Sequence, residues 1–279
     1  MNKFALLQVG INTYPYVPLR GCVNDCRNLA EQFAKFSLTP SLYQKLFDAD
    51  ATRKNILDRL RWLVQQDVPT LIFQYSGHGT RLRDRDGDES SHYDSAIVPV
   101  DFDSAGVILD DELVGLYALV PPQKRLIILS DSCHSGKSQR AFITRWKSKL
   151  FRASTPRFLP ENLIPELPEE ASIQVRKNKW LRGHGWPAIT RRKSFLENSE
   201  RCLLISTCKE EQTSADACIG GQWQGAGTAS LIWAWSQLGI HGSYGAAADW
   251  ANRWLKSSGY DQVLRVEGRR ENFDKPFFT

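Results

Sequence analysis

The chain has 279 residues, of which 42% are hydrophobic and 24% charged, with a formal net charge of +5. These proportions are typical of a globular protein with a sizeable core. No apolar run approaches the length of a bilayer span, and no long apolar stretch precedes a small-residue cleavage site, so we expect neither a membrane span nor a signal peptide.

The six cysteines form no CxxC pair, and no histidine pair has zinc-finger spacing. This pattern favours free thiols in a reducing compartment, and we therefore expect a cytoplasmic protein. The charge is unevenly spread, since residues 137–193 hold fourteen Lys and Arg against four Glu, which leaves the remainder of the chain acidic.

Short apolar runs and helical periodicities alternate through the first 130 residues. Buried strands are predicted at 4–9, 42–47, 70–75 and 125–130, and helices at 23–36, 51–64 (with Thr52 as N-cap) and 110–120. Residues 79–93 are polar and contain a glycine, so we expect a loop there.

From 137 to 193 the periodicity is poor, and five of the thirteen prolines fall in this stretch. We interpret it as a long insertion, partly irregular and exposed. Regular structure is predicted again as a strand at 201–206, helices at 226–238 and 244–256, and an edge strand at 262–266.

Strands that alternate with helices predict an α/β protein with a parallel sheet covered on both faces. Functional groups in such sheets gather beyond the carboxyl ends of the strands. His78, in the sequence SGHG, and Cys133, in DSCHSG, each follow a predicted strand by about three residues.

A cysteine nucleophile needs a base within hydrogen-bond reach. We therefore predict that Cys133 is a nucleophile and His78 its general base, with the amides of Gly79 and Cys133 facing the developing oxyanion. A histidine or cysteine at either position alone is more often structural; a histidine about 55 residues upstream of the cysteine is the caspase order.

Several motifs in this order resemble the metacaspases, and most of all the bacterial branch called orthocaspases. The motifs are GINTY at 10–14, LRGCVND at 19–25, ATRKNI at 51–56, SGHG at 76–79, DDEL at 110–113, DSCHSG at 131–136 and QTSAD at 212–216. The resemblance implies a caspase-like fold with a central, mostly parallel six-stranded sheet flanked by helices on both faces. It further implies one domain over 1–279, made of a p20-like part (1–136), the basic insertion (137–197) and a p10-like part (198–279).

Members of this family cleave after Arg or Lys, and the resemblance assigns the residues that receive the basic side chain (S1, the pocket for the residue before the cleaved bond). They are Asp25 and Asp131, with Ser76 and Cys22 lining the same pocket and Asp216 as a weaker candidate. A basic side chain needs such carboxylates. The alternative is that Asp25 caps or pairs within its helix and that Asp131 is a turn residue.

Many metacaspases are activated by calcium, held by acidic residues that correspond to Asp94, Asp110 and Asp111 and by a further aspartate. That last position falls at or near Arg140, where a cation stands instead. We therefore predict that the protein requires no metal or other cofactor, the alternative being a different alignment of the loop with calcium still bound.

The basic insertion has two interpretations. An enzyme that prefers Arg and Lys carries, just after its nucleophile, a segment rich in both, so self-cleavage there is favoured. Binding of nucleic acid is the alternative, but aromatic residues do not alternate with the basic ones, so we expect no nucleic-acid partner.

The sequence therefore predicts an Arg/Lys-specific cysteine endopeptidase that acts on proteins or peptides and cleaves itself. The resemblance favours a monomer. Two alternatives stay open, namely a non-catalytic caspase-like regulator and a peptidase of the same fold with another preference.

Overall fold

The computed structural model describes residues 3–83, 93–133, 154–165, 192–208 and 212–277. A six-stranded sheet runs through its centre in the order β12-β9-β7-β3-β1-β2, and only β12 is antiparallel to its neighbour. These strands are β1 Phe4–Gly10, β2 Leu42–Phe47, β3 Thr70–Ser76, β7 Arg125–Asp131, β9 Cys202–Ser206 and β12 Arg265–Glu267.

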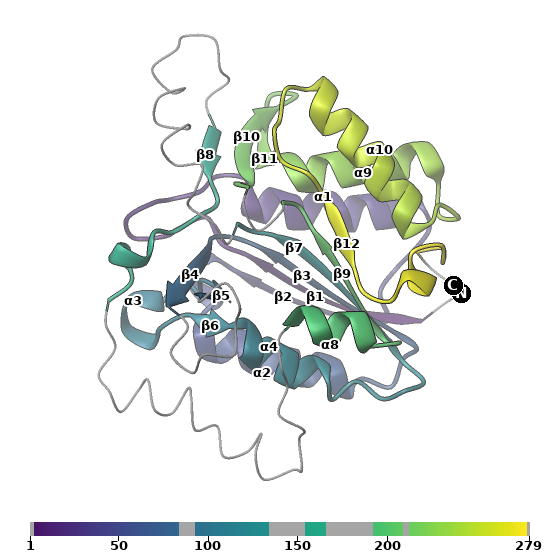
Figure 1. Ribbon diagram of the computed structural model, residues 1–279, viewed down its shortest axis with the longest axis horizontal. Helices are drawn as coiled ribbons and strands as arrows, with labels where there is room; N and C mark the ends of the chain where they lie inside the picture. The colour runs from purple at the N-terminus through teal and green to yellow at the C-terminus, as the bar shows by residue number, and fades with distance from the viewer. Residues whose placement is uncertain (1–2, 84–92, 134–153, 166–191, 209–211, 278–279) are drawn as a thin grey trace.

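Helices cover both faces of this sheet (Figure 1). On one face lie α1 Cys22–Lys35, α9 Ala226–Leu238 and α10 Tyr244–Ser257; on the other lie α2 Arg53–Gln65, α4 Asp110–Tyr117 and α8 Arg192–Asn198. The remaining helical elements are α3 Phe102–Ala105, η1 Asp48–Asp50, η2 Glu161–Leu163 and η3 Arg270–Asn272. The predicted α/β fold with a mostly parallel six-stranded sheet is confirmed.

Strand β1 explains why the sheet is covered on both sides. All seven of its residues are buried. Phe4 and Leu6 face the core under α1, α9 and α10, whereas Ala5, Leu7 and Val9 face the core under α2 and α4. Because successive side chains of a strand point to opposite faces, a continuous apolar run requires cover on both.

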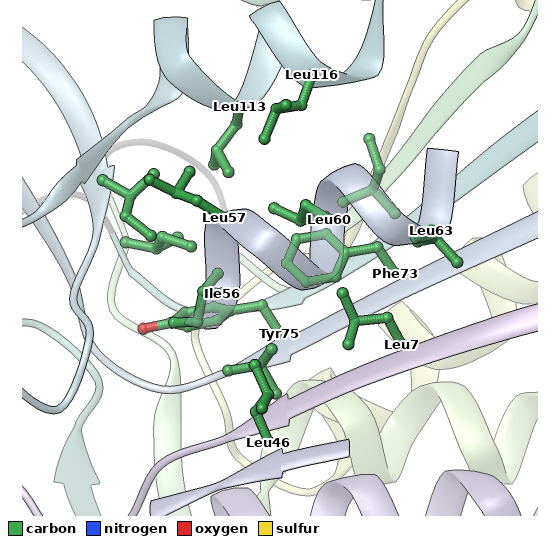
Figure 2. Packing of buried hydrophobic residues seen from close by; sticks show 14 of the residues in the cluster. Leu7, Leu46, Ile56, Leu57, Leu60, Leu63, Phe73, Tyr75, Leu113 and Leu116 are labelled. Carbon is green, nitrogen blue, oxygen red and sulfur yellow. The ribbon is translucent and has the colours of Figure 1, made fainter. Parts of the chain in front are cut away.

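The core under α2 and α4 is built from leucine, isoleucine and aromatic side chains (Figure 2). Helix α2 presents Ile56, Leu60 and Leu63 to the strands, at the spacing of one helical face. Its N-cap is Thr52, whose hydroxyl accepts a hydrogen bond from the Asn55 amide at 3.2 Å, as the sequence predicts.

Two small sheets beside the central one were not predicted. The first contains β4 Gly79–Arg83, β5 Tyr93–Ile97 and β6 Ile108–Leu109; the second contains β8 Ser154–Pro156, β10 Ala215–Ile219 and β11 Gln222–Gly225. The predicted loop over 79–93 is therefore wrong at 79–83, which pair antiparallel with β5, and at Tyr93, where β5 begins. The predicted edge strand is present, but shifted to Arg265–Glu267.

Among the described residues, no helix combines the length and apolar character that crossing a membrane requires.

Candidate active site

Strands β3 and β7 lie side by side and end at the same edge of the sheet. Their parallel register pairs Ser76 with Asp131, the last residue of each strand. The Gly77 amide then donates to the Asp131 carbonyl oxygen at 3.3 Å. Both strands end here. His78 lies two residues beyond the end of β3, and Cys133 lies two residues beyond the end of β7. The sheet therefore brings the two predicted dyad residues to one edge, as expected for parallel strands.

A buried arginine occupies the centre of this site. Arg157 is the largest fully buried side chain of the described residues, and it comes from the segment that we predicted to be exposed. That prediction is wrong for residues 157–159, which are all buried. The rest of the basic insertion lies outside the described residues, apart from 154–165 and 192–197.

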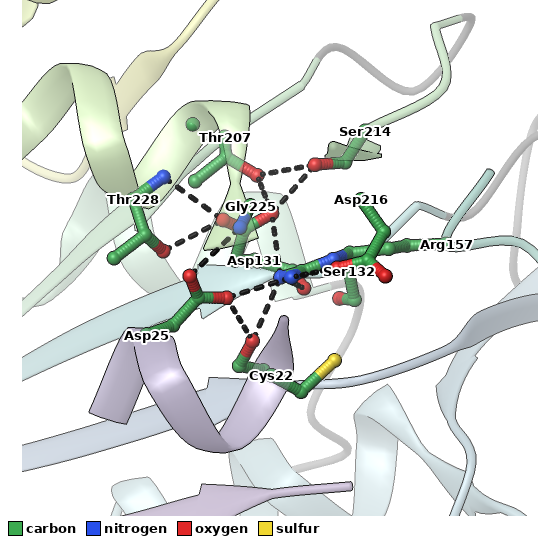
Figure 3. Close-up of polar contacts among 12 residues, drawn as sticks. Cys22, Asp25, Asp131, Ser132, Arg157, Thr207, Ser214, Asp216, Gly225 and Thr228 are labelled. Carbon is green, nitrogen blue, oxygen red and sulfur yellow. Dashed lines mark hydrogen bonds and ion pairs between the residues drawn. The ribbon is translucent and has the colours of Figure 1, made fainter. Parts of the chain in front are cut away.

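The guanidinium group of Arg157 contacts all three predicted pocket carboxylates (Figure 3). Its Nη2 atom lies 2.7 Å from Asp25 Oδ2 and 2.9 Å from Asp216 Oδ1, and its Nη1 atom lies 3.3 Å from Asp131 Oδ1. Nη1 also donates to the Ser76 hydroxyl oxygen at 2.7 Å. The structure thus brings Asp25, Asp131 and Asp216 around one cation.

Each carboxylate is also held by the surrounding protein. Asp25 accepts from the Ser76 hydroxyl at 2.6 Å and from the Gly225 amide at 2.7 Å. Asp216 accepts from the amides of Arg20 and Gly21 at 2.7 and 3.0 Å. Asp25 is therefore not a helix cap and Asp131 is not a turn residue, because both carboxylates point at the Arg157 guanidinium.

Asp131 has the densest set of donors. It accepts hydrogen bonds from the hydroxyl groups of Thr207, Ser214 and Thr228, at 2.8, 2.5 and 2.6 Å, and from the Thr228 amide at 2.9 Å. A Cβ atom at Gly225 would collide with the Asp131 carboxylate and with the Arg157 guanidinium, so this position requires glycine.

Burial and charge pull the pKa values of the pocket in opposite directions. Burial raises the pKa of Asp25 to about 7, although Arg157 acts to lower it. Burial also acts to raise the pKa of Asp131, but Arg157 and the three hydroxyl donors outweigh it and hold that pKa below its usual value. The surrounding carboxylates keep the pKa of Arg157 raised despite its burial. The three carboxylates therefore surround a permanent cation, the Arg157 guanidinium.

Cys22 borders the same pocket from the start of α1. Its amide donates to Asn12 Oδ1 at 2.8 Å, and its side chain is fully buried. Burial raises the pKa of its thiol, and the nearby Asp216 and Asp25 charges raise it further, while Arg157 acts against them. Cys22 therefore stays neutral beside this cluster of charges.

The main chain of Arg157 is held as firmly as its side chain. Its carbonyl oxygen accepts from the Gly79 amide at 3.0 Å and from the Cys133 amide at 3.2 Å, the two amides predicted to face an oxyanion. Its own amide donates to the Ser214 carbonyl oxygen at 3.0 Å, and the preceding residues of β8 pair antiparallel with β10. Residues 154–157 thus cross the site as an added strand, the way extended peptides bind sheet edges.

His78 is held in one orientation by its neighbours. Its ring lies 4.5 Å from the Tyr14 ring, centroid to centroid, and its amide donates to the Tyr14 hydroxyl oxygen at 3.0 Å. Nε2 lies 2.7 Å from the Val17 carbonyl oxygen, which can only accept, so Nε2 carries the proton of the neutral ring. Nδ1 is buried and has no hydrogen-bond partner among the described residues, so it holds the lone pair of the neutral ring.

Burial lowers the pKa of His78 to about 4, and the charge of Arg157 lowers it further, although the Val17 carbonyl oxygen acts to raise it. We expect the imidazole of His78 in a Cys133→Ala protein to stay neutral until about pH 4, as measured by ¹⁵N NMR of the ring nitrogens. The unfolded chain takes up this proton near pH 6.5, so the unfolded state binds more protons between these values and stability falls on acidification, by about 3 kcal/mol.

Two observations check this assignment. An Arg157→Gln change removes the neighbouring cation, so the midpoint of His78 should move towards its ordinary value. A midpoint near 6.5 in the Cys133→Ala protein would contradict the full burial of the ring.

Cys133 lies beneath the same segment. The residue is fully buried and packs against Phe158 and Cys208. Its thiol donates to the Gln212 carbonyl oxygen. Because Phe158 supplies part of the cover, the burial depends on the crossing segment.

The residues expected at a calcium site lie on β5 and at the start of α4. Asp94 pairs in register with Leu82, and Asp110 and Asp111 begin α4. Within the described ranges, no three His, Cys, Asp or Glu side chains are arranged to hold a metal ion. Arg140 lies outside those ranges, so calcium independence stays a prediction.

Among the contributors to the site that sequence reasoning missed are Arg157, Val17, Thr207, Ser214 and Thr228. Ser214 lies inside the QTSAD motif and Thr207 lies a few residues before it, so the polar residues of this stretch were the signal available. Val17 acts through its carbonyl oxygen, which any residue supplies, so its side chain carries no signal.

Residues 3–140 match the model of the metacaspase peptidase C14 domain. Metacaspase-1 of Yarrowia lipolytica is 35% identical over 234 residues, which cover 77% of this chain and 50% of that protein. Metacaspase-1A of Aspergillus fumigatus is 33% identical over 255 residues, 81% of this chain and 59% of that protein. The chain thus spans between half and three-fifths of the length of these two relatives.

A crystal structure of a protein from Geobacter sulfurreducens has a TM-score of 0.69 and 23% identity, and the match covers 99% of this chain and 98% of that one. This likeness supports the fold alone. The family model and the metacaspase relatives agree with the motifs around the site, and the chain is therefore a metacaspase-like member of the caspase family of cysteine peptidases.

Proposed function

We propose that this protein is a cysteine endopeptidase that cleaves after arginine, and less well after lysine, through Cys133 and His78. The observation that carries the proposal is the bound Arg157, whose side chain lies among three carboxylates while its carbonyl oxygen accepts from two amides. A peptide held in this way presents a polarised carbonyl carbon beside the nucleophile.

The reaction follows from these positions. His78 Nδ1 removes the thiol proton, and the Cys133 sulfur attacks the carbonyl carbon once the thiol has turned away from Gln212. The Gly79 and Cys133 amides stabilise the oxyanion. His78 returns the proton to the leaving amine, and water then hydrolyses the thioester to release the carboxyl product. The Val17 carbonyl oxygen holds Nε2–H, which keeps the lone pair on Nδ1.

Arginine fits the pocket better than lysine for geometric reasons. Two guanidinium nitrogens reach separate carboxylates at 2.7, 2.9 and 3.3 Å and a hydroxyl at 2.7 Å. A single ammonium group on a shorter side chain cannot meet partners spread over that fork. Lysine is therefore the slower of the two substrates.

The bond after Arg157 is the proposed site of self-cleavage. In the form described here, Arg157 fills the carboxylate pocket and Phe158 packs on Cys133, so this segment also excludes other substrates. Hydrolysis of the Arg157–Phe158 bond would free residue 157 from the rest of the segment. We retain the division into 1–136, 137–197 and 198–279, the cytoplasmic location and the monomer as parts of this proposal.

Mass spectrometry of the purified chain tests self-cleavage. We expect the wild type to yield fragments 1–157 and 158–279, whereas Cys133→Ala stays intact. Cys202→Ala is the matched control, since Cys202 is a buried thiol in β9 that makes no contact with the carboxylate pocket, and it should be cleaved like the wild type. An intact but active wild type, or equal clipping of Cys133→Ala, would contradict this assignment.

Fluorogenic peptides with Arg, Lys, Asp or Asn before the cleaved bond separate the remaining alternatives. The proposal expects turnover of Arg above Lys and none of Asp or Asn. A regulator without catalysis cleaves none of them, and a peptidase of another specificity prefers Asp or Asn.

A further inference from the structure

The two residues after Arg157 are more deeply seated than the three before it. Phe158 is 8% exposed and Leu159 is fully buried. Ser154, Thr155 and Pro156, by contrast, are only half-buried and pair with β10 through their main chains. The site therefore contacts the upstream residues through backbone and the downstream residues through side chains.

Phe158 packs against the nucleophile itself. Its neighbours in a separate small apolar cluster are Cys133 and Cys208. The Cys208 thiol donates to the Ser132 carbonyl oxygen at 3.2 Å, which holds this wall beside the nucleophile. The residue that follows the cleaved bond thus enters an apolar recess formed by two sulfur-containing side chains.

Leu159 joins the large apolar core that also contains residues of α2 and α4. It belongs to the same cluster as Leu57, Leu60 and Leu113. Its amide donates to the Gly79 carbonyl oxygen at 2.9 Å, and its carbonyl oxygen accepts from the Thr80 hydroxyl at 2.7 Å. Both polar groups of its backbone therefore have hydrogen-bond partners. An aliphatic side chain adds no further polar group, so it can be buried at this position without leaving one unpaired.

We propose that these two recesses select substrates, so that the enzyme prefers proteins in which the cleaved arginine is followed by an aromatic and then an aliphatic residue. The inference rests on the proposed function, because it extends the same site downstream of the cleaved bond. An acidic residue at either position would lose its hydration in an apolar recess, which disfavours such substrates.

Internally quenched peptides with the sequence Ser-Thr-Pro-Arg followed by different residue pairs test this preference. We expect kcat/KM for Phe-Leu to exceed that for Asp-Leu, Phe-Asp and Gly-Gly by about tenfold or more, the discrimination that an apolar pocket supplies. Any part of the enzyme's own segment that remains bound competes equally with all four peptides, so the ratios are unaffected by it.

A change in the recess wall checks which residues carry the preference. Cys208→Leu narrows the recess for Phe158 and should lower the ratio of Phe-Leu to Ala-Leu peptides about tenfold. Cys218→Leu is the matched control, because Cys218 is a partly exposed thiol on β10 that lies outside the Cys133–Phe158–Cys208 cluster, and should keep the wild-type ratio. The ratio of kcat/KM values for two peptides within one variant does not depend on the overall activity of that variant. If Cys208→Leu fails to fold, the four peptides measured with the wild type still test the preference.

The outcomes distinguish the two proposals. If all arginine peptides are cleaved within twofold of one another, or if Asp is preferred after the arginine, the downstream preference is wrong while the arginine-specific peptidase stands. If none of the arginine peptides is cleaved, the proposed function itself is wrong.

Discussion

Replacing Arg157 by glutamine in a Cys133→Ala protein should lower the free energy of unfolding by about 3–5 kcal/mol at pH 8. The Cys133→Ala change prevents self-cleavage during the measurement. The loss follows because Asp25, Asp131 and Asp216 are almost fully buried around the guanidinium and would be left without their shared cation. Urea denaturation measures it.

The loss should be smaller at pH 5. Without the cation, the folded state binds protons on these carboxyl groups more readily than the unfolded state does, so the stability of the variant falls as the pH rises. Arg61→Gln is the control, since Arg61 pairs on the surface with Asp58 and should change stability by at most about 1 kcal/mol. Equal losses for the two variants at both pH values would show that Arg157 is not the counter-ion of the pocket.

Replacing Asp131 by asparagine should lower kcat/KM for arginine peptides by about 10²–10⁴-fold, because a buried charge pair that loses one member costs about 3–5 kcal/mol. Asp131 is the carboxylate whose pKa the site holds low, so it is ionised whenever the substrate binds. Peptidase assays with peptides that carry arginine or citrulline before the cleaved bond measure the effect.

Citrulline has the shape of arginine without its charge, which separates recognition from folding. The arginine-to-citrulline ratio should fall steeply in Asp131→Asn, whereas the exposed control Asp103→Asn keeps the wild-type ratio. If both peptides lose activity equally in Asp131→Asn, Asp131 is needed for the shape of the site and not for the charge of the substrate.

The middle of the central sheet was predictable because β1, β3, β7 and β9 are largely apolar runs. Leu42–Phe47 and the helix Ala226–Leu238 have the predicted bounds, and the other predicted elements differ by a few residues at their ends. Strand β4 escaped prediction because Gly79–Arg83 mixes two arginines with a glycine, and it is stabilised mainly by pairing with β5. Pairing partners that lie far away in the chain leave no local periodicity.

The predicted residues of the site were recognisable because each lies in a short motif that resembles the metacaspases. Arg157 was not, because its surroundings are charged and broken by proline, which indicates an exposed segment. Its three carboxylates come from α1, the end of β7 and β10, at distant points of the chain. No pattern local to Arg157 encodes that arrangement.

By itself, the sequence determined the fold class, the positions of His78 and Cys133 at one edge of a parallel sheet, and the three acidic residues that meet there, because strand patterns and motifs are local. Only the tertiary structure decided what those residues surround. The burial of Arg157, the cover over Cys133 and the recesses for Phe158 and Leu159 depend on segments far apart in the chain coming together, since a charge becomes buried only where distant partners compensate it.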